Sequence, residues 1–274
     1  MNQIRRNLRN IYTGFRRVSA KWRILPDFII LGAQKSGTSS LWYYLSQHPE
    51  IRMSIRKETH FFDFNYHQDL AWYRAYFPLQ YKVKPGLVVG ESTPYYLCHP
   101  HVAERIYQVL PKVKLIAVLR NPTARALSHY YHEVKKGTEN LPLMDALVAE
   151  DERTQSEWEK MNLDSSYASA IHRAFSYKSR GKYLMHLSRF WEYFDKNQLL
   201  IVQSEKLFQD TAGSLAEIFQ FLGLEDSCRI KDISVRNIGS YPKHVPPEVV
   251  DYLDSYFKEY NLALYKEIDQ EFNW

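Results

Sequence analysis

Residues 28–41 read FIILGAQKSGTSSL, and this stretch decides the fold. It begins with four apolar residues, 28–31, which are typical of a strand buried in a parallel sheet. A turn of small residues around Lys35 follows, and the apolar periodicity that resumes at Leu41 predicts a helix. A loop between a strand and a helix N-terminus gathers backbone N–H groups and partial positive charge. The stretch therefore predicts a phosphate-binding loop, to which Lys35 adds a full charge.

This loop differs from the P-loop of nucleoside triphosphatases, which requires G-x-x-x-x-G-K-[ST]. Gly32 and Gly37 have the required spacing, but Thr38 occupies the position of the lysine. The later apolar strand, 113–119, ends in Arg120 rather than in an aspartate that would bind Mg²⁺. We therefore expect neither ATP nor GTP hydrolysis, and no Cys/His pattern with metal spacing predicts a metal site.

Two motifs together resemble a known enzyme family. The loop resembles the 5′-phosphosulfate loop of the sulfotransferases that use 3′-phosphoadenosine 5′-phosphosulfate (PAPS). The second strand ends in Arg120, and Ser128 follows eight residues later; the 3′-phosphate site of that family is similar. Arginine offers a planar fork to phosphate oxygens and serine a hydroxyl donor, which suits both residues to this role.

Two further segments resemble the carbohydrate sulfotransferases, especially the heparan sulfate branch. Residues 56–63, RKETHFFD, resemble the K-E-x-x-F-F segment, and 239–243, GSYPK, before a helix at 247–253, resemble the loop that closes over the nucleotide. That loop usually carries a lysine near position 237, where this chain has Asn237 preceded by Arg236. The resemblance covers nearly the whole chain.

The resemblance implies a nucleotide site and assigns roles within it. Lys35 would stabilise the charge that builds on the leaving phosphate. The 5′-phosphate and sulfate would be held by Lys35, Ser36, Gly37, Thr38 and Ser39. The 3′-phosphate would be held by Arg120 and Ser128. The residues expected to close over the nucleotide are Arg236, Gly239, Ser240 and Tyr241.

The resemblance also implies a general base, for which Glu58 is the first candidate. A carboxylate suits an alcohol or amine acceptor if burial raises its pKa toward neutrality; otherwise Glu58 is an exposed partner of Lys57 or Arg56. His132 is the next candidate because it lies four residues after Ser128, on the same helix face. The remaining histidine candidates, each with a purely structural role as the alternative, are His60 and His129.

The net charge of +5 is concentrated in an N-terminal arm, 1–25, which holds seven basic residues and no acidic one. The rest of the chain holds 29 basic and 31 acidic residues, which does not favour nucleic-acid binding. Apolar residues recur in the arm at helical spacing: Ile4, Leu8, Ile11, Phe15, Val18 and Trp22. Such a basic amphipathic helix either lies on an anionic membrane or packs its apolar stripe on the domain or on a second subunit.

Residues 26–274 are expected to form a single sulfotransferase domain. Alternating strands and helices predict a P-loop-like, three-layer α/β/α fold with a central parallel sheet. The polar segment 138–180 is the expected site of acceptor selection. No apolar run is long enough for a transmembrane span or a secretory signal, and only Cys98 and Cys228 are present. The expected location is therefore the cytoplasm, with peripheral membrane contact through the arm as an option.

The function that these patterns favour is transfer of a sulfuryl group from PAPS to a hydroxyl or amine of an acceptor. The heparan-like motifs favour a carbohydrate or glycoconjugate, as a small molecule or an oligosaccharide. A lipid, polyketide or phenolic acceptor is the alternative. A nucleotide kinase and a non-catalytic nucleotide-binding module are more remote. The oligomeric state is not predicted.

Overall fold

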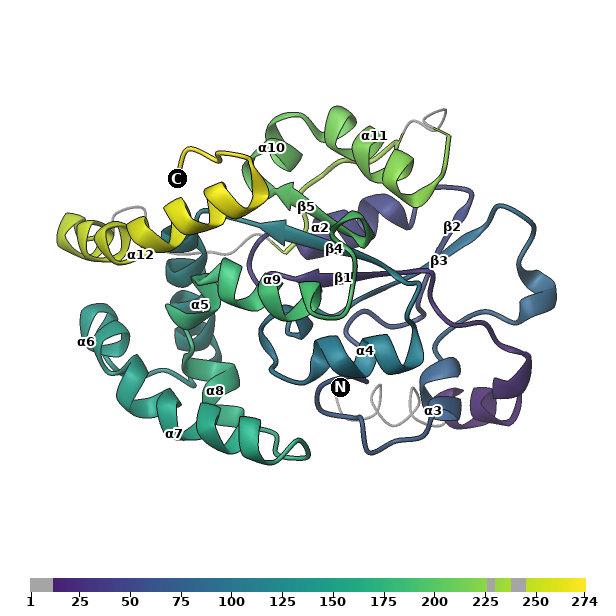
Figure 1. Cartoon of the computed structure of the whole chain (residues 1–274), viewed down its shortest axis with the longest axis horizontal. Coiled ribbons are helices and arrows are strands. Elements are labelled where there is room, and N and C mark those ends of the chain that lie inside the picture. Colours follow the sequence, from purple (N-terminus) through teal and green to yellow (C-terminus); the bar gives the residue numbers. More distant parts are fainter. Residues whose placement is uncertain (1–11, 226–229, 238–244) are drawn as a thin grey trace.

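The computed structural model describes residues 12–225, 230–237 and 245–274 (Figure 1). Its centre is a five-stranded, all-parallel sheet with the strand order β2-β3-β1-β4-β5. The strands are β1 (Phe28–Gly32), β2 (Ile51–Met53), β3 (Val88–Ser92), β4 (Lys114–Leu119) and β5 (Leu199–Gln203).

Every residue of β1 is buried, since helices cover both faces of the sheet. Phe28 and Ile30 belong to one hydrophobic cluster, while Ile29 and Leu31 belong to another. Successive strand residues point to opposite faces, so the two clusters lie on the two sides of the sheet. The first cluster includes residues of α2 (Thr38–Leu45), α10 (Ser204–Gln209) and α11 (Thr211–Leu222). The second includes residues of α3 (Leu70–Arg74), α4 (Val102–Val109), α9 (Tyr183–Trp191) and α12 (Pro247–Ile268).

A third cluster lies beyond the sheet and joins α5 (Pro122–Lys136) and α6 (Leu143–Val148) to the first half of α12. The helices α7 (Glu150–Leu163) and α8 (Ala170–Phe175) extend from it on the same side of the molecule (Figure 1). Short 3₁₀ turns complete the chain: η1 (Ala20–Trp22), η2 (Gln80–Lys82), η3 (Tyr96–Cys98), η4 (Ser179–Gly181) and η5 (Lys196–Gln198).

The topology fixes where a ligand binds. The chain passes from β1 to strands on one side of it, and then to β4 on the other side. In such sheets the crevice outside the carboxyl ends of the strands, at the switch in direction, is the ligand site. The loop after β1 and Arg120 after β4 both lie there, and the expected three-layer α/β/α fold is confirmed.

Several elements of the structure were not predicted from the sequence. Strand β2 was not expected, α12 is much longer than 247–253, and the segment 138–180 contains three helices. In that segment buried carboxylates take the place of an apolar stripe. Glu150 is fully buried and accepts hydrogen bonds from the backbone N–H groups of Lys178 and Ser179. These helices are anchored by polar contacts, so their sequence lacks hydrophobic periodicity.

The described part of the N-terminal arm contacts the domain through arginines. Residues 12–18 are helical, and Arg16 Nη2 and Arg23 Nη1 both donate to the Phe77 carbonyl, at 2.6 and 2.7 Å. Its apolar residues face solvent instead: Phe15, Val18 and Trp22. The expectation that this stripe packs on the domain is therefore wrong for these three residues. The other three apolar positions lie outside the described residues: Ile4, Leu8 and Ile11.

Across the described ranges, no helix is both long enough and apolar enough to cross a membrane. Cys98 is buried and free, whereas Cys228 lies outside the described residues.

Candidate active site

A cavity of about 1050 Å³ lies at the carboxyl edge of the sheet. It is bounded by the β1–α2 loop, the end of β4, one face of α5 and the segment that contains α8. Most of the candidates from the sequence line it: Lys35, Gly37, Thr38, Ser39, Glu58, Arg120, Ser128, His132 and Arg236. Residues separated by up to two hundred positions in the chain thus share one cavity.

The β1–α2 loop ends in a helix N-terminus that no side chain caps. Helix α2 begins at Thr38, and its N-cap residue is Gly37, whose φ is 91°. This left-handed conformation favours glycine, and a Cβ here would lie 2.7 Å from Phe208 Cζ, so the Phe208 ring would have to move. The first N–H groups of a helix have no intrahelical acceptor, and here they face a cavity, which makes them donors for an anion.

Lys35 lines the cavity from within this loop. Its φ is 71°, a left-handed conformation that is uncommon for a residue with a side chain. Burial lowers the pKa of its ammonium group, and the more distant carboxylates of Glu133 and Glu58 partly offset this. No carboxylate among the described residues lies within ion-pair distance of it. Lys35 is thus a partly buried cation that an incoming anion can neutralise.

Ser36 departs from its expected role. It is fully buried and does not line the cavity, and its backbone N–H donates to the Ala33 carbonyl at 3.2 Å. The tight turn that carries Lys35 into the cavity turns Ser36 beneath the loop. The prediction that Ser36 donates to the phosphosulfate is therefore not supported by its position.

Arg120 is held by one contact to the β1–α2 loop and one to α9 (Tyr183–Trp191). Its Nη1 donates to the Lys35 carbonyl at 3.1 Å, and its own carbonyl accepts a hydrogen bond from Tyr183 Oη at 2.7 Å. Helix α5 follows, with Asn121 as its N-cap and Pro122 in its first turn. Ser128 lies six residues after Pro122, about 9 Å along the helix axis, and lines the same cavity as Arg120.

Helix α5 sorts the histidine candidates by its period. Every fourth residue from Ala124 lines the cavity, namely Ala124, Ser128, His132 and Lys136. In the neighbouring row Glu133 also lines the cavity, but Arg125 and His129 do not, and both are fully buried. Burial lowers the pKa of His129 well below the ordinary value. His129 does not reach the cavity, and its candidacy as a base is wrong. His132 does reach it, with 38% of its side chain exposed.

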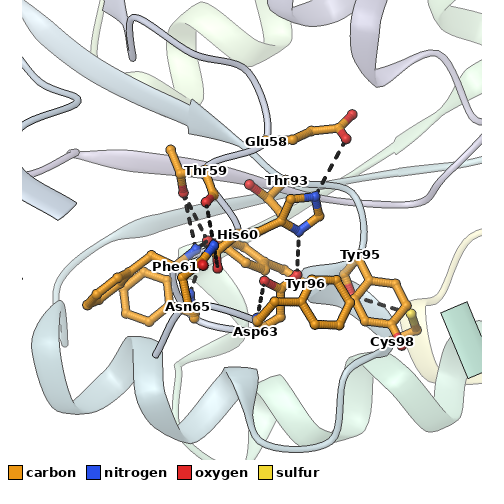
Figure 2. A network of polar contacts seen from close by, with 12 residues as sticks. Glu58, Thr59, His60, Phe61, Asp63, Asn65, Thr93, Tyr95, Tyr96 and Cys98 are labelled. Atoms are coloured by element: carbon orange, nitrogen blue, oxygen red, sulfur yellow. Dashed lines mark hydrogen bonds and ion pairs between the residues drawn. The ribbon is translucent and has the colours of Figure 1, made fainter. Parts of the chain in front are cut away.

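Figure 2 shows Glu58 at the end of a polar chain that runs into the protein. Glu58 Oε2 lies 3.7 Å from His60 Nε2, and His60 Nδ1 lies 2.8 Å from Asp63 Oδ2. Glu58 lines the cavity, whereas His60 and Asp63 lie behind it. Lys57 Nζ contacts the other Glu58 oxygen at 2.7 Å. The carboxylate is therefore held from two sides, with its remaining surface toward the cavity.

These contacts determine the charges of the pair. Burial raises the pKa of Glu58, but His60 and Lys57 outweigh it and lower the pKa to about 2. Burial lowers the pKa of His60, but Asp63 and Glu58 outweigh it and raise the pKa to about 9. Burial therefore does not bring the pKa of Glu58 toward neutrality, the condition under which a carboxylate was expected to suit the role of base. His60 is an imidazolium at neutral pH, so it supports Glu58 and cannot itself act as the base.

A buried carboxylate fixes the turn that presents Glu58. Glu91 is fully buried at the end of β3, and it accepts hydrogen bonds from Thr59 Oγ1 at 2.5 Å and Thr93 Oγ1 at 2.8 Å. Tyr96 Oη adds a third at 3.0 Å. Thr59 lies between Glu58 and His60, which both have positive φ. The positive φ angles of Glu58 and His60 are therefore stabilised by the hydrogen bond from Thr59 to the buried Glu91 carboxylate.

The segment expected to close over the nucleotide, 236–241, is described only in part. Arg236 lines the cavity, but its guanidinium pairs with Asp232 at 2.6 Å and stacks on the Tyr43 ring. Its backbone N–H donates to Ser40 Oγ at 2.9 Å, which holds 230–237 against α2. The other three residues expected to close over the nucleotide lie outside the described residues: Gly239, Ser240 and Tyr241.

Several cavity residues carried no assignment from the sequence. Lys136 could have been found, because it continues the four-residue spacing of Ser128 and His132. Glu133, which pairs with Lys136 at 2.7 Å, and Arg173, which comes from α8, had no comparable signal. Asp63 lies three residues after His60, a spacing that alone indicates nothing about function. Among the described residues, no group of three or more His, Cys, Asp or Glu could hold a metal ion.

Comparison with known proteins places this geometry in a family. The model of the sulfotransferase domain matches residues 25–238. Human heparan sulfate glucosamine 3-O-sulfotransferase 6 is 30% identical, over 92% of this chain and 74% of that protein. The membrane-associated sulfotransferase kil1 of Dictyostelium discoideum is 26% identical, over 94% of this chain and 68% of that protein.

A solved structure agrees with these matches. The crystal structure of a sulfotransferase from Alicyclobacillus acidocaldarius superposes with a TM-score of 0.75 at 27% identity, over 91% of this chain and 98% of that one. The similarity therefore extends over most of the fold.

Proposed function

Because the chain belongs to the sulfotransferase domain family and is a PAPS-dependent sulfotransferase, we propose that it sulfates a hydroxyl or amine of a carbohydrate acceptor within this cavity. The observation that carries the proposal is the position of Lys35, a cation without an anionic partner among the described residues. The uncapped N-terminus of α2 lies next to it. The similarity to heparan sulfate 3-O-sulfotransferases supports a carbohydrate as the acceptor.

In this proposal the nucleotide lies along the carboxyl edge of β1 and β4. Lys35 and the N–H groups of Gly37, Thr38 and Ser39 contact the 5′-phosphosulfate. Arg120 and Ser128 contact the 3′-phosphate, and Arg236 lies near the nucleotide while it remains bound to Asp232. Each of these residues lines the cavity, and each offers a donor to phosphate oxygens.

The transfer step requires an acceptor oxygen or nitrogen in line with the bond that breaks. The acceptor lone pair forms the new bond to sulfur, while the bond from sulfur to the 5′-phosphate oxygen breaks and its electrons pass to that phosphate. Lys35 stabilises the growing charge on the phosphate, which is electrostatic catalysis. The acceptor proton passes to Glu58. A carboxylate with a low pKa suffices because the acceptor becomes strongly acidic as its bond to sulfur forms.

The acceptor side of the cavity carries a candidate recognition residue, Arg173. It lines the cavity from α8, and its guanidinium lies 5.0 Å from the centre of the Phe64 ring, on which it stacks. It has no salt bridge within the described ranges. An arginine held on an aromatic ring offers its N–H fork to a carboxylate or sulfate. We assign it to an anionic group of the carbohydrate.

Arg173→Ala tests that assignment. We expect the KM for an anionic oligosaccharide acceptor to rise roughly tenfold to a hundredfold, as for the loss of one charged hydrogen bond. The Kd for 3′-phosphoadenosine 5′-phosphate (PAP) is expected to stay unchanged. Arg153→Ala is a control for the loss of an arginine outside the cavity. Arg153 also stacks on a phenylalanine, Phe175, but it pairs with Glu139 at 2.7 Å and does not line the cavity. An unchanged acceptor KM in Arg173→Ala contradicts the assignment.

Calorimetric titration with PAP, and with ATP as the comparison ligand, tests the nucleotide site. We expect PAP to bind at least about a hundredfold more tightly than ATP, because two separate phosphate positions are recognised. Transfer of label from PAPS to N-sulfated oligosaccharides, phenols and lipids then tests the acceptor class. Preference for ATP, or binding of neither, contradicts the nucleotide assignment; labelling of phenols or lipids alone contradicts the carbohydrate assignment.

A further inference from the structure

The described part of the N-terminal arm has the reverse of the usual arrangement of an amphipathic helix on a protein. Phe15 is 74% exposed, Val18 81% and Trp22 54%. The arginines of the arm contact the domain instead. Arg17 pairs with Asp69 at 2.6 Å, and Arg16 and Arg23 donate to carbonyl groups just beyond α3. Cations suit that position because the last carbonyls of a helix lack intrahelical partners. The domain thus holds the arm by its charged face and leaves the apolar face in water.

Tyr81, a further exposed aromatic residue, extends this surface. Leu79 forms a backbone bridge with Arg23, which brings η2 beside the arm, and Tyr81 in η2 is 77% exposed. Tyr12 is 56% exposed, and its hydroxyl accepts a hydrogen bond from Arg16 Nη1 at 3.3 Å. We call Tyr12, Phe15, Val18, Trp22 and Tyr81 the arm patch.

Lysines flank the arm patch and stack on its rings. Lys21 Nζ lies 4.4 Å from the centre of the Trp22 ring, and Lys82 Nζ lies 5.9 Å from that of Tyr81. Aromatic rings with adjacent lysines suit the boundary between acyl chains and headgroups, where the ring enters and the ammonium reaches a phosphate. The first 25 residues contain no acidic side chain that would oppose an anionic surface.

We propose that the arm patch binds the surface of an anionic lipid bilayer. The apolar side chains enter the interface, and the lysines contact lipid phosphates. The arm precedes the first residue of β1, whereas the cavity follows its last residue. The two sites therefore lie at opposite edges of the sheet, and Figure 1 shows α3 and α5 far apart. Lipid binding and sulfuryl transfer are separable, so the proposal does not rest on the acceptor or the nucleotide.

The test uses the full chain and two triple variants. The patch variant carries Phe15→Ser, Val18→Ser and Trp22→Ser. The control variant carries Val148→Ser, Leu163→Ser and Leu262→Ser, which remove apolar side chains that are equally exposed but lie on α6, α7 and α12. Sedimentation measures partitioning onto vesicles of equimolar phosphatidylcholine and phosphatidylglycerol, and onto vesicles of phosphatidylcholine alone. Light scattering without lipid gives the oligomeric state, and PAP titration shows that each variant is folded.

We expect the unaltered chain and the control variant to bind the anionic vesicles, and binding to weaken with salt. The patch variant is expected to bind roughly a hundredfold less well, with unchanged PAP affinity. Absence of binding to anionic vesicles overturns the proposal, as does an equal loss in the control variant. The proposal is also overturned if the unaltered chain and the control variant are dimers while the patch variant is a monomer, because a second copy of the chain then covers the arm patch.

Discussion

Lys35→Ala is expected to lower kcat by about a hundredfold to a thousandfold, the usual effect of removing one preorganised group that stabilises transition-state charge. The reason is geometric. Lys35 is the cation within the β1–α2 loop, and no carboxylate in the described ranges pairs with it. Its charge is available to the leaving phosphate, on which negative charge increases during transfer. The effect on PAP affinity is expected to be smaller, because Arg120, Ser128 and the α2 N-terminus remain.

Lys136→Ala is the matched control for Lys35→Ala. Lys136 also lines the cavity, but it pairs with Glu133 at 2.7 Å, and half of its side chain is exposed. Its removal changes the net charge of the cavity by the same amount. We expect a loss of less than about tenfold, because a paired and screened charge contributes little. Single-turnover rates with labelled PAPS measure both variants. Equal losses would mean that only the overall charge matters, which contradicts the role assigned to Lys35.

The sequence predicted best those parts of the site that adjoin the buried strands. The residues of β1 and β4 are almost all apolar, and strand ends in a parallel sheet have few possible positions. Once the two strands were recognised, Lys35 and Arg120 were therefore expected to lie close together at this edge of the sheet. Ser128 and His132 followed from the period of α5. His129 follows Ser128 by one residue and so points about 100° away from it around the helix, into the protein.

Other features depend on contacts that a linear pattern does not contain. The low pKa of Glu58 depends on His60, whose charge depends in turn on Asp63. The burial of Ser36 depends on the turn around Lys35. The helices of 138–180 are anchored by buried carboxylates such as Glu150 rather than by an apolar stripe. In each case a polar residue has a tertiary partner, and its type alone does not identify that partner.

The arm shows the same limit in another form. Its period correctly predicted an amphipathic helix over the described turns, because spacing fixes which residues share a face. The face that contacts the domain could not be predicted, since it depends on the carbonyl groups beyond α3. Arginine binds such carbonyls well, so the charged face was retained by the domain and the apolar face was left exposed.

Glu58→Gln is expected to lower kcat by about a hundredfold to ten-thousandfold, the range for losing a general base. Glutamine has the same shape and can still accept a hydrogen bond from His60, but it cannot take the acceptor proton. PAP affinity should change by less than about twofold, because Glu58 is not among the residues proposed to contact the nucleotide. Glu133→Gln makes the same change at a second cavity carboxylate, and a smaller loss is expected there. Full activity in Glu58→Gln would falsify the assignment of the base.

The pH dependence gives an independent test of the Glu58–His60 pair. Above pH 9 the imidazolium of His60 loses its proton, so kcat/KM is expected to fall there. The pKa of Glu58 is lowered to about 2, so Glu58 does not account for a loss of activity near neutral pH. Burial lowers the pKa of His99 to about 2 and of His172 to about 3, so the unfolded chain binds protons that the folded chain excludes.

Stability should therefore fall as the pH drops below about 6.5, by about 1.4 kcal/mol per pH unit for each such histidine. We expect the acid loss of activity to coincide with loss of circular dichroism, while the alkaline loss above pH 9 occurs in a folded protein. His60→Gln removes the titrating group. The fall in kcat/KM above pH 9 should then be absent, and kcat/KM at lower pH should be smaller than in the unaltered chain. If the alkaline limb persists in His60→Gln, another group controls it, and the chain from Asp63 through His60 to Glu58 has only a structural role.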